Sequence, residues 1–292
     1  MSTFPVNVGM LPTLEPELIQ DIYGLADPFD VNIPIFVTNT EDIDLYLRVY
    51  IKNPPSGWVT YSQDLGLIPA NSSKDFVLNF QRNKPTLTEG EYSESITLVF
   101  EFYTDSEYTN LYTSKEFTLT VLYVDHTDPS WTILDEDNFD LGNNEGFNNR
   151  SLDCINNILG VSPHDPSDFK VTDKNYLSAP YSYGYPYCGY RGAYQTRKTY
   201  SLPSGIEKAF LTLHYYNGEG YITWIKAVVA TPDCSKYKVF FLDKTWRLNA
   251  WRRTTLPLFK GEDNVFAFYF WWGSTSSTYL DIYIDDIVVF YK

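Results

Sequence analysis

The sequence predicts an all-β protein built from two tandem antiparallel β-sandwiches. Aromatic residues make up 17% of the chain, with 25 Tyr, 19 Phe and 7 Trp, and such rings are enriched in strands. Runs rich in Ala, Leu and Glu, which would favour helices, are missing from the sequence. The length of 292 residues accommodates two domains, each large enough for a core of its own.

Apolar runs separated by turn residues indicate a first sandwich at residues 30–125. Ile43, Leu45, Leu47 and Val49 alternate with Asp44, Tyr46, Arg48 and Tyr50, as in a strand with one face in a core. We expect strands at 31–38, 43–51, 57–61, 74–80, 91–103 and 116–124. Turn-forming residues lie between these runs, at a spacing typical of an Ig-like sandwich. Residues 1–29, interrupted by several prolines, are expected to form an extended leader.

Short motifs in this region carry a family resemblance. An Asn-Thr turn, a Pro-x-Gly-Trp sequence, a Leu-Ile-Pro-Ala stretch followed by Ser, and a Pro before Gly-x-Tyr occur in this order. They lie at Asn39–Thr40, Pro55–Trp58, Leu67–Ala70 with Ser73, and Pro85 with Gly90 and Tyr92. This order resembles the NEW3 or CARDB-like Ig modules appended to bacterial and archaeal glycosidases and surface proteins. Such modules act as spacers or assembly surfaces, so the resemblance implies a fold rather than a chemistry.

A polar linker at 126–130 precedes a second unit at 131–292. Its opening, from Trp131 to Asp140, and its close, from Leu280 to Phe290, are similar to the first and last strands of galactose-binding-like jelly rolls, as found in carbohydrate-binding modules. Apolar runs lie between them at 208–217, 221–230, 237–243 and 264–272. The resemblance implies a jelly-roll sandwich.

That resemblance also implies a structural Ca²⁺. Jelly rolls of this kind often bind the ion where the first and last strands meet, because a hard cation collects carboxylate and carbonyl oxygens there. The matching positions are Asp137, Asp140, Asp285 and Asp286. The alternative is that these acids face solvent at strand ends. No other cofactor is expected.

Tyrosines are concentrated at 176–194, with Gly and Pro between them. Flat rings with a hydroxyl at the edge suit the faces of sugars and equally suit protein partners. The alternative is a lid over one face of the sandwich, with its tyrosines half-buried. Two tryptophans end an apolar strand, so that one ring points in and the other out. The candidate glycan- or partner-binding residues are Tyr181, Tyr183, Tyr185, Tyr187, Tyr190, Tyr194, Trp271 and Trp272.

Cysteines and sequons give further candidate modification sites. Cys154, Cys188 and Cys234 lack the spacing of a metal site and allow at most one disulfide within the chain, with buried free thiols as the alternative. Asn71 and Asn149 begin sequons, which makes them candidate glycosylation sites.

Charge and histidine content argue against several functions. The chain has 22 Lys and Arg against 37 Asp and Glu, a net charge of −15, and lacks a basic patch for nucleic acid. It also lacks an apolar run long enough for membrane insertion. None of the 3 histidines lies beside a nucleophile motif, and acids are too frequent for paired carboxylates to indicate glycoside hydrolysis. We therefore expect a protein that is not an enzyme.

Together these features predict a virion-surface structural or attachment protein, such as a turret, spike or fibre component. A signal peptide is not expected, which favours a virion over a secreted adhesin. The general style is similar to structural proteins of archaeal viruses. The expected partners are other copies of the chain, neighbouring virion proteins or a host-surface glycan. The alternatives are an extracellular carbohydrate-binding or cell-surface adhesion protein, and an accessory protein of a glycoside hydrolase.

Overall fold

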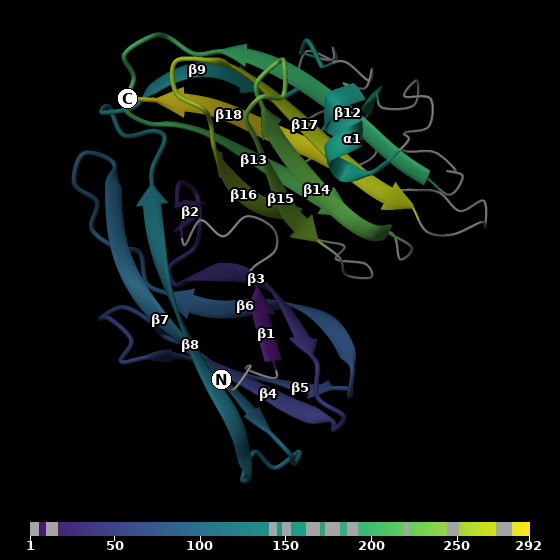
Figure 1. Cartoon of the computed structure of the whole chain (residues 1–292). Helices are drawn as coiled ribbons and strands as arrows, with labels where there is room; N and C mark the ends of the chain where they lie inside the picture. Colours follow the sequence, from purple (N-terminus) through teal and green to yellow (C-terminus); the bar gives the residue numbers. More distant parts are fainter. Residues whose placement is uncertain are drawn as a thin grey trace. The chain divides into compact units, whose positions relative to one another are not determined.

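The computed structural model of the chain (Figure 1) describes residues 6–9, 17–139, 145–147, 153–161, 170–172, 182–185, 192–218, 222–243, 251–272 and 282–292. The chain divides into two compact units, Met1–Asp128 and Pro129–Lys292. Strands form nearly all of the regular structure, with one short helix in the described part. The predicted all-β class with tandem sandwiches is confirmed.

Two sheets form the first unit. Its strands are β1 (Val6–Gly9), β2 (Glu17–Asp21), β3 (Phe29–Asn39), β4 (Leu45–Lys52), β5 (Ser62–Ile68), β6 (Ser72–Arg82), β7 (Glu91–Tyr103) and β8 (Leu111–Val124). One sheet has the order β1-β3-β6 and the other the order β2-β8-β7-β4-β5. Pairing is antiparallel except between β2 and β8, which run parallel. The segment before residue 30 thus contributes a strand to each sheet.

The first core lies between these sheets. Leu45, Leu47 and Val49 are fully buried, as their alternation predicts, whereas Ile43 precedes β4 and is 42% exposed. The strand expected at 57–61 is wrong, because Gly57 has a φ of 101° and Trp58 makes only an isolated bridge with Arg82. The next strand, β5, begins four residues after Trp58, at Ser62.

A buried ion pair joins the two sheets of this core. Arg82 on β6 donates from Nε and Nη2 to the Glu94 carboxylate on β7, at 2.7 and 3.0 Å. The same carboxylate accepts hydrogen bonds from Trp58 Nε1 at 3.2 Å and Tyr123 Oη at 2.8 Å. Burial opposes the charge of Arg82, but the bond to Glu94 raises its pKa above the ordinary value. Each buried charge is therefore compensated by its neighbours.

The second unit also has two sheets. Its elements are β9 (Thr132–Asp137), α1 (Asp153–Leu159), β10 (Lys170–Thr172), β11 (Ser182–Tyr185), β12 (Gly192–Ser201), β13 (Ala209–Asn217), β14 (Ile222–Ala230), β15 (Tyr237–Asp243), β16 (Trp251–Pro257), β17 (Asp263–Trp272) and β18 (Ile282–Tyr291). One sheet has the order β10-β11-β18-β13-β16, with β9 also on β18, and the other the order β12-β17-β14-β15.

Alternate residues of the central strands fill the core between these two sheets. They include Leu211, Leu213, Ile225, Ala227, Phe266, Phe268, Phe270, Ile282 and Ile284, all fully buried. The residues between them therefore lie on the outer faces of the sheets. No helix in the described part of the chain is long and apolar enough to cross a membrane.

Candidate functional site

Two tryptophans lie side by side on the outer face of the β12-β17-β14-β15 sheet. The antiparallel register pairs Trp224 on β14 with Trp271 on β17. Each follows the alternation of its strand, because the neighbours Ile225 and Phe270 are fully buried in the core. The two ring centres are 6.2 Å apart and the ring planes differ by 29°. Both rings keep partial exposure and are stacked on each other on this face.

A lysine adjoins this surface. Lys226 lies two residues after Trp224 on the same face, and its Nζ is 4.4 Å from the centre of the Trp224 ring. The side chain is half-buried, and burial lowers the pKa of its ammonium. We call Trp224, Lys226 and Trp271 the tryptophan platform. It combines apolar area for stacking with a cation that can donate hydrogen bonds.

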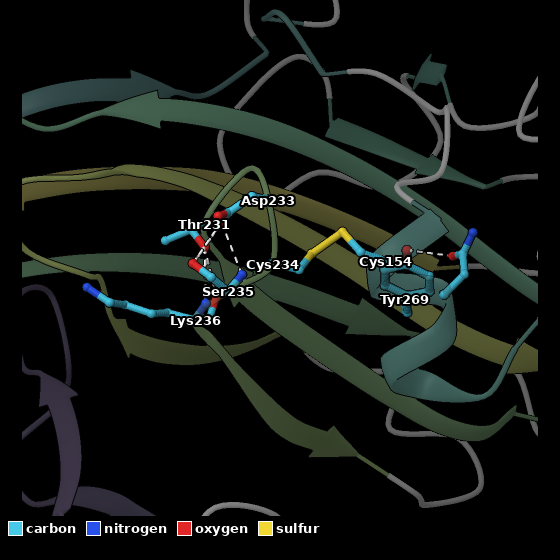
Figure 2. The surroundings of a disulfide bond; sticks show 8 residues. Cys154, Thr231, Asp233, Cys234, Ser235, Lys236 and Tyr269 are labelled. Atoms are coloured by element: carbon cyan, nitrogen blue, oxygen red, sulfur yellow. Dashed lines mark hydrogen bonds between the residues drawn. A yellow bond between two sulfur atoms is a disulfide. The ribbon is translucent and has the colours of Figure 1, made fainter.

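Part of this outer face is covered by α1. Ile155 of the helix packs on Val228, Ala267 and Tyr269 of the sheet, in one buried cluster. A disulfide joins Cys154 of α1 to Cys234 after β14, and Tyr269 Oη donates to Asn156 Oδ1 at 3.0 Å (Figure 2). Along the strands, the tryptophan platform adjoins this cluster, since Lys226 is paired with Tyr269 and Trp224 packs in part against it.

The turn that carries Cys234 is held by its own side chains. Asp233 accepts hydrogen bonds from Thr231 Oγ1 at 2.7 Å and from the Ser235 amide at 3.0 Å (Figure 2). These bonds lower the pKa of Asp233 to about 2. The sequence allowed one disulfide among three cysteines without naming the pair, and Cys188 lies outside the described residues.

The opposite sheet presents a second aromatic row on its outer face. Tyr216 on β13 is paired with Trp251 on β16 and with Tyr283 on β18. Its ring centre is 5.6 Å from Trp251 and 6.0 Å from Tyr283. The next row holds Arg253, His214 and Asp285. Tyr283 and Asp285 are buried, so this face is less open than the tryptophan platform.

Three of the four aspartates expected to bind Ca²⁺ are described, and these three do not form one cluster. Asp137 on β9 is paired with Ile287 of β18 on the core side of the sheet, whereas Asp285 is paired with His214 on the outer side. Asp286 Oδ2 is 3.9 Å from His214 Nδ1. Asp140 lies outside the described residues. The described residues contain no set of three or more His, Cys, Asp or Glu side chains that could hold a metal ion.

A lysine takes the place that a cation would need beside Asp137. Lys198 on β12 contacts the carboxylates of Asp137 and Asp135, and Tyr200 Oη donates to Asp137 at 3.0 Å. Burial raises the pKa of Asp137 to about 6, although Lys198 acts in the other direction. An ammonium in contact would repel a divalent ion that requires six or more oxygens. The described residues therefore do not fit Ca²⁺ at this carboxylate.

The predicted tyrosines are only partly described. Tyr181, Tyr187 and Tyr190 lie outside the described residues. The backbones of Tyr183, Tyr185 and Tyr194 are described, and their register partners are Ile284, Ile282 and Phe270, three residues buried in the core. Trp272 is described by its backbone alone, opposite Gly192. A binding role for these residues stays a prediction.

Trp271 is the predicted residue that the structure places on the outer face with its side chain described. Its partner Trp224 was missed, although the alternation in residues 221–230 could have placed it opposite to Ile225. Of the two sequons, Asn71 is exposed at the turn before β6 with a φ of 50°, and Asn149 lies outside the described residues. Both stay candidate glycosylation sites.

Comparison with solved structures finds β-sandwich proteins at low similarity. A carbohydrate-binding module in complex with β-1,4-galactotriose is 14% identical, with a TM-score of 0.39, over 53% of this chain and 95% of its own. Carbohydrate-binding modules of the β-sandwich superfamily match at 11% identity and a TM-score of 0.38, over 91% and 94%. A cleaved adhesin domain of Lys-gingipain from Porphyromonas gingivalis matches at 16% and 0.37, over 55% and 98%.

Sequence comparisons give no match. No protein-family model matches the chain. No curated protein matches it in sequence. The likeness to NEW3 or CARDB-like modules and to structural proteins of archaeal viruses therefore stays a prediction.

Proposed function

We propose that this chain binds carbohydrate through the tryptophan platform of its second unit and acts by attachment rather than by catalysis. The observation that carries the proposal is the pairing of Trp224 and Trp271 on the outer face of a sheet, with both rings partly exposed. The main core is filled from the other side of both strands, while Trp224 also packs in part against the smaller cluster beneath α1.

The geometry suits a sugar ring. Pyranoses present an apolar face of C–H groups and an edge of hydroxyls, and a flat aromatic surface excludes water from the apolar face. The two stacked rings, inclined by 29°, offer aromatic area on two adjacent strands. Lys226 adds a hydrogen-bond donor beside the rings, and this donor fixes the orientation of the polar edge of the sugar. Because the platform is built on strands, its shape is defined before a ligand binds.

Glycan-array binding by the full chain, followed by titration with its best oligosaccharide, tests this proposal. We expect Trp271→Ala and Trp224→Ala each to weaken binding about tenfold or more while the far-ultraviolet circular dichroism stays unchanged. Trp251→Ala is the matched control, since Trp251 lies on the outer face of the opposite sheet. Loss of binding in Trp251→Ala but not in Trp271→Ala would contradict the platform and move the site to the aromatic row of Trp251, Tyr216 and Tyr283.

The wider setting is a separate part of the proposal. We propose that the chain acts at the surface of a virion or a cell. Its partners would be a host glycan, other copies of the chain or neighbouring virion proteins. Co-purification with particles tests the virion role, and fractionation with a cell envelope would contradict it. Incubation of the protein with the oligosaccharide that it binds tests the absence of catalysis, since shortened products would show hydrolysis.

A further inference from the structure

The cation of the tryptophan platform differs from other buried cations of this chain. Arg82 contacts Glu94, and Lys198 contacts Asp135 and Asp137. Exposed cations are also paired, as Arg48 is with Asp64 and Lys52 with Glu116. For Lys226 the described side chains supply a ring, Trp224, and no carboxylate, while Asp243 on the neighbouring strand β15 is described by its backbone alone. The contrast occurs in a chain with 37 acidic side chains, where partners are abundant.

Such a lysine has an energetic cost. Burial removes part of the water around the ammonium, and a neutral ring compensates this loss only in part. Burial is also the sole cause acting on its pKa, which lies below the ordinary value of lysine. The neighbours on the same face are apolar, among them Val228 and Ala230. An unbranched apolar side chain would fit these surroundings with a smaller desolvation cost. Packing alone therefore does not account for a lysine at this position.

From these observations, and resting on the proposed function, we infer that the tryptophan platform selects anionic saccharides. The sugar ring lies on Trp224 and Trp271, and a carboxylate or sulfate group beside that ring accepts a charge-assisted hydrogen bond from Lys226 Nζ. Such bonds are stronger than neutral ones, and the partly desolvated position strengthens them further. The acidic net charge of the chain makes non-specific binding of polyanions weak, so that selection depends on local positive charge such as that of Lys226.

The test compares matched ligands that differ in charge alone. The full chain is titrated by calorimetry with a panel of uronic acid oligosaccharides and their methyl esters, and with a sulfated oligosaccharide and its desulfated form. We expect one acidic ligand to bind about 10- to 100-fold more tightly than its neutral counterpart, the range of a hydrogen bond to a charged group. The class that shows this difference identifies carboxylate or sulfate as the anion. High salt should reduce the difference.

Substitutions of Lys226 test whether this side chain causes the difference in affinity between charged and neutral ligands. Lys226→Met should abolish the preference by weakening the binding of the anionic ligand more than that of its neutral counterpart, whereas Lys226→Arg should keep it. Lys260→Met removes an exposed lysine from the same unit and should have no effect. Equal affinity for charged and neutral forms, or a preference that survives in Lys226→Met, would overturn the inference and leave the proposed function standing. Unchanged binding of both forms in Trp271→Ala would instead overturn the proposed function.

Discussion

Lys198 and Lys226 belong to the same four-stranded sheet and have opposite surroundings. Lys198 on β12 points into the space between the sheets and contacts two aspartates of β9. Hydrogen bonds to these aspartates raise its pKa against the effect of burial. Lys226 on β14 points outward, contacts a tryptophan ring, and has its pKa lowered by burial. Lys198 is neutralised by the protein and is therefore structural, whereas Lys226 has no described carboxylate beside it, as its proposed role in ligand binding requires.

The first unit provides the strongest case of internal neutralisation, and breaking it should have the largest effect. Glu94→Gln removes the charge that compensates Arg82 while keeping the shape of the side chain. Both side chains are about 95% buried, so we expect a loss of about 3–5 kcal/mol in the free energy of unfolding of this unit. Urea unfolding followed by tryptophan fluorescence measures it. Glu116→Gln, at an exposed ion pair with Lys52, is the control and should change little.

Removal of Lys198 tests the same rule in the second unit. Lys198→Met leaves Asp137 buried beside Tyr200 without its cation. We expect the second unit to lose about 2–4 kcal/mol at neutral pH, and to recover part of it in acid, where the aspartates are protonated. Thermal unfolding of the variant at both pH values measures the loss. Equal stability of variant and natural chain would mean that the ion pair is not structural.

The pH dependence of stability should report the same carboxylate. Burial raises the pKa of Asp137 to about 6, above the ordinary value of 3.8. The folded state then binds this proton more tightly than the unfolded chain does, so the stabilisation is fully present below 3.8 and is lost as the pH rises through about 6. Asp137 should therefore make the second unit about 1 kcal/mol more stable near pH 5 than near pH 7.

The variant Asp137→Asn isolates this effect from that of other acids. The pKa of Asp233 is lowered to about 2, so this group changes the stability in the opposite direction and only in strong acid. The gain in stability between neutral and mildly acidic pH should be smaller in Asp137→Asn than in the natural chain, by the contribution of the one carboxylate. A gain of the same size in both proteins would show that Asp137 is ionised throughout this range.

The fold could be predicted from the sequence to a greater extent than the candidate site. Alternation identifies the faces of β4 and predicts that one of Trp271 and Trp272 points outward, because the period of a strand is a local property. The pairing of Trp224 with Trp271, of Arg82 with Glu94 and of Cys154 with Cys234 depends on register and on contacts between distant segments. Nothing in the local sequence specifies these contacts. The helix α1 was missed for a similar reason, since a run of seven residues has too few turns for a periodic signal.

The smallest effect concerns Lys226 and should have the opposite sign to that of Lys198. Lys226→Met removes a half-buried ammonium that no described carboxylate compensates, and the new side chain fits the apolar surface of Trp224 and Val228. We expect the second unit to gain about 0.5–1 kcal/mol in its free energy of unfolding, within the range of other optimised surface positions.

Parallel melting curves of Lys198→Met and Lys226→Met measure one substitution at two sites of one sheet. If Lys226→Met gains stability and loses binding of the anionic ligand, Lys226 lowers the stability of the fold and contributes to recognition, as expected of a binding residue. A stability loss at position 226 would show instead that Lys226 contributes to the fold as Lys198 does, and would remove the contrast on which its assignment to ligand binding depends.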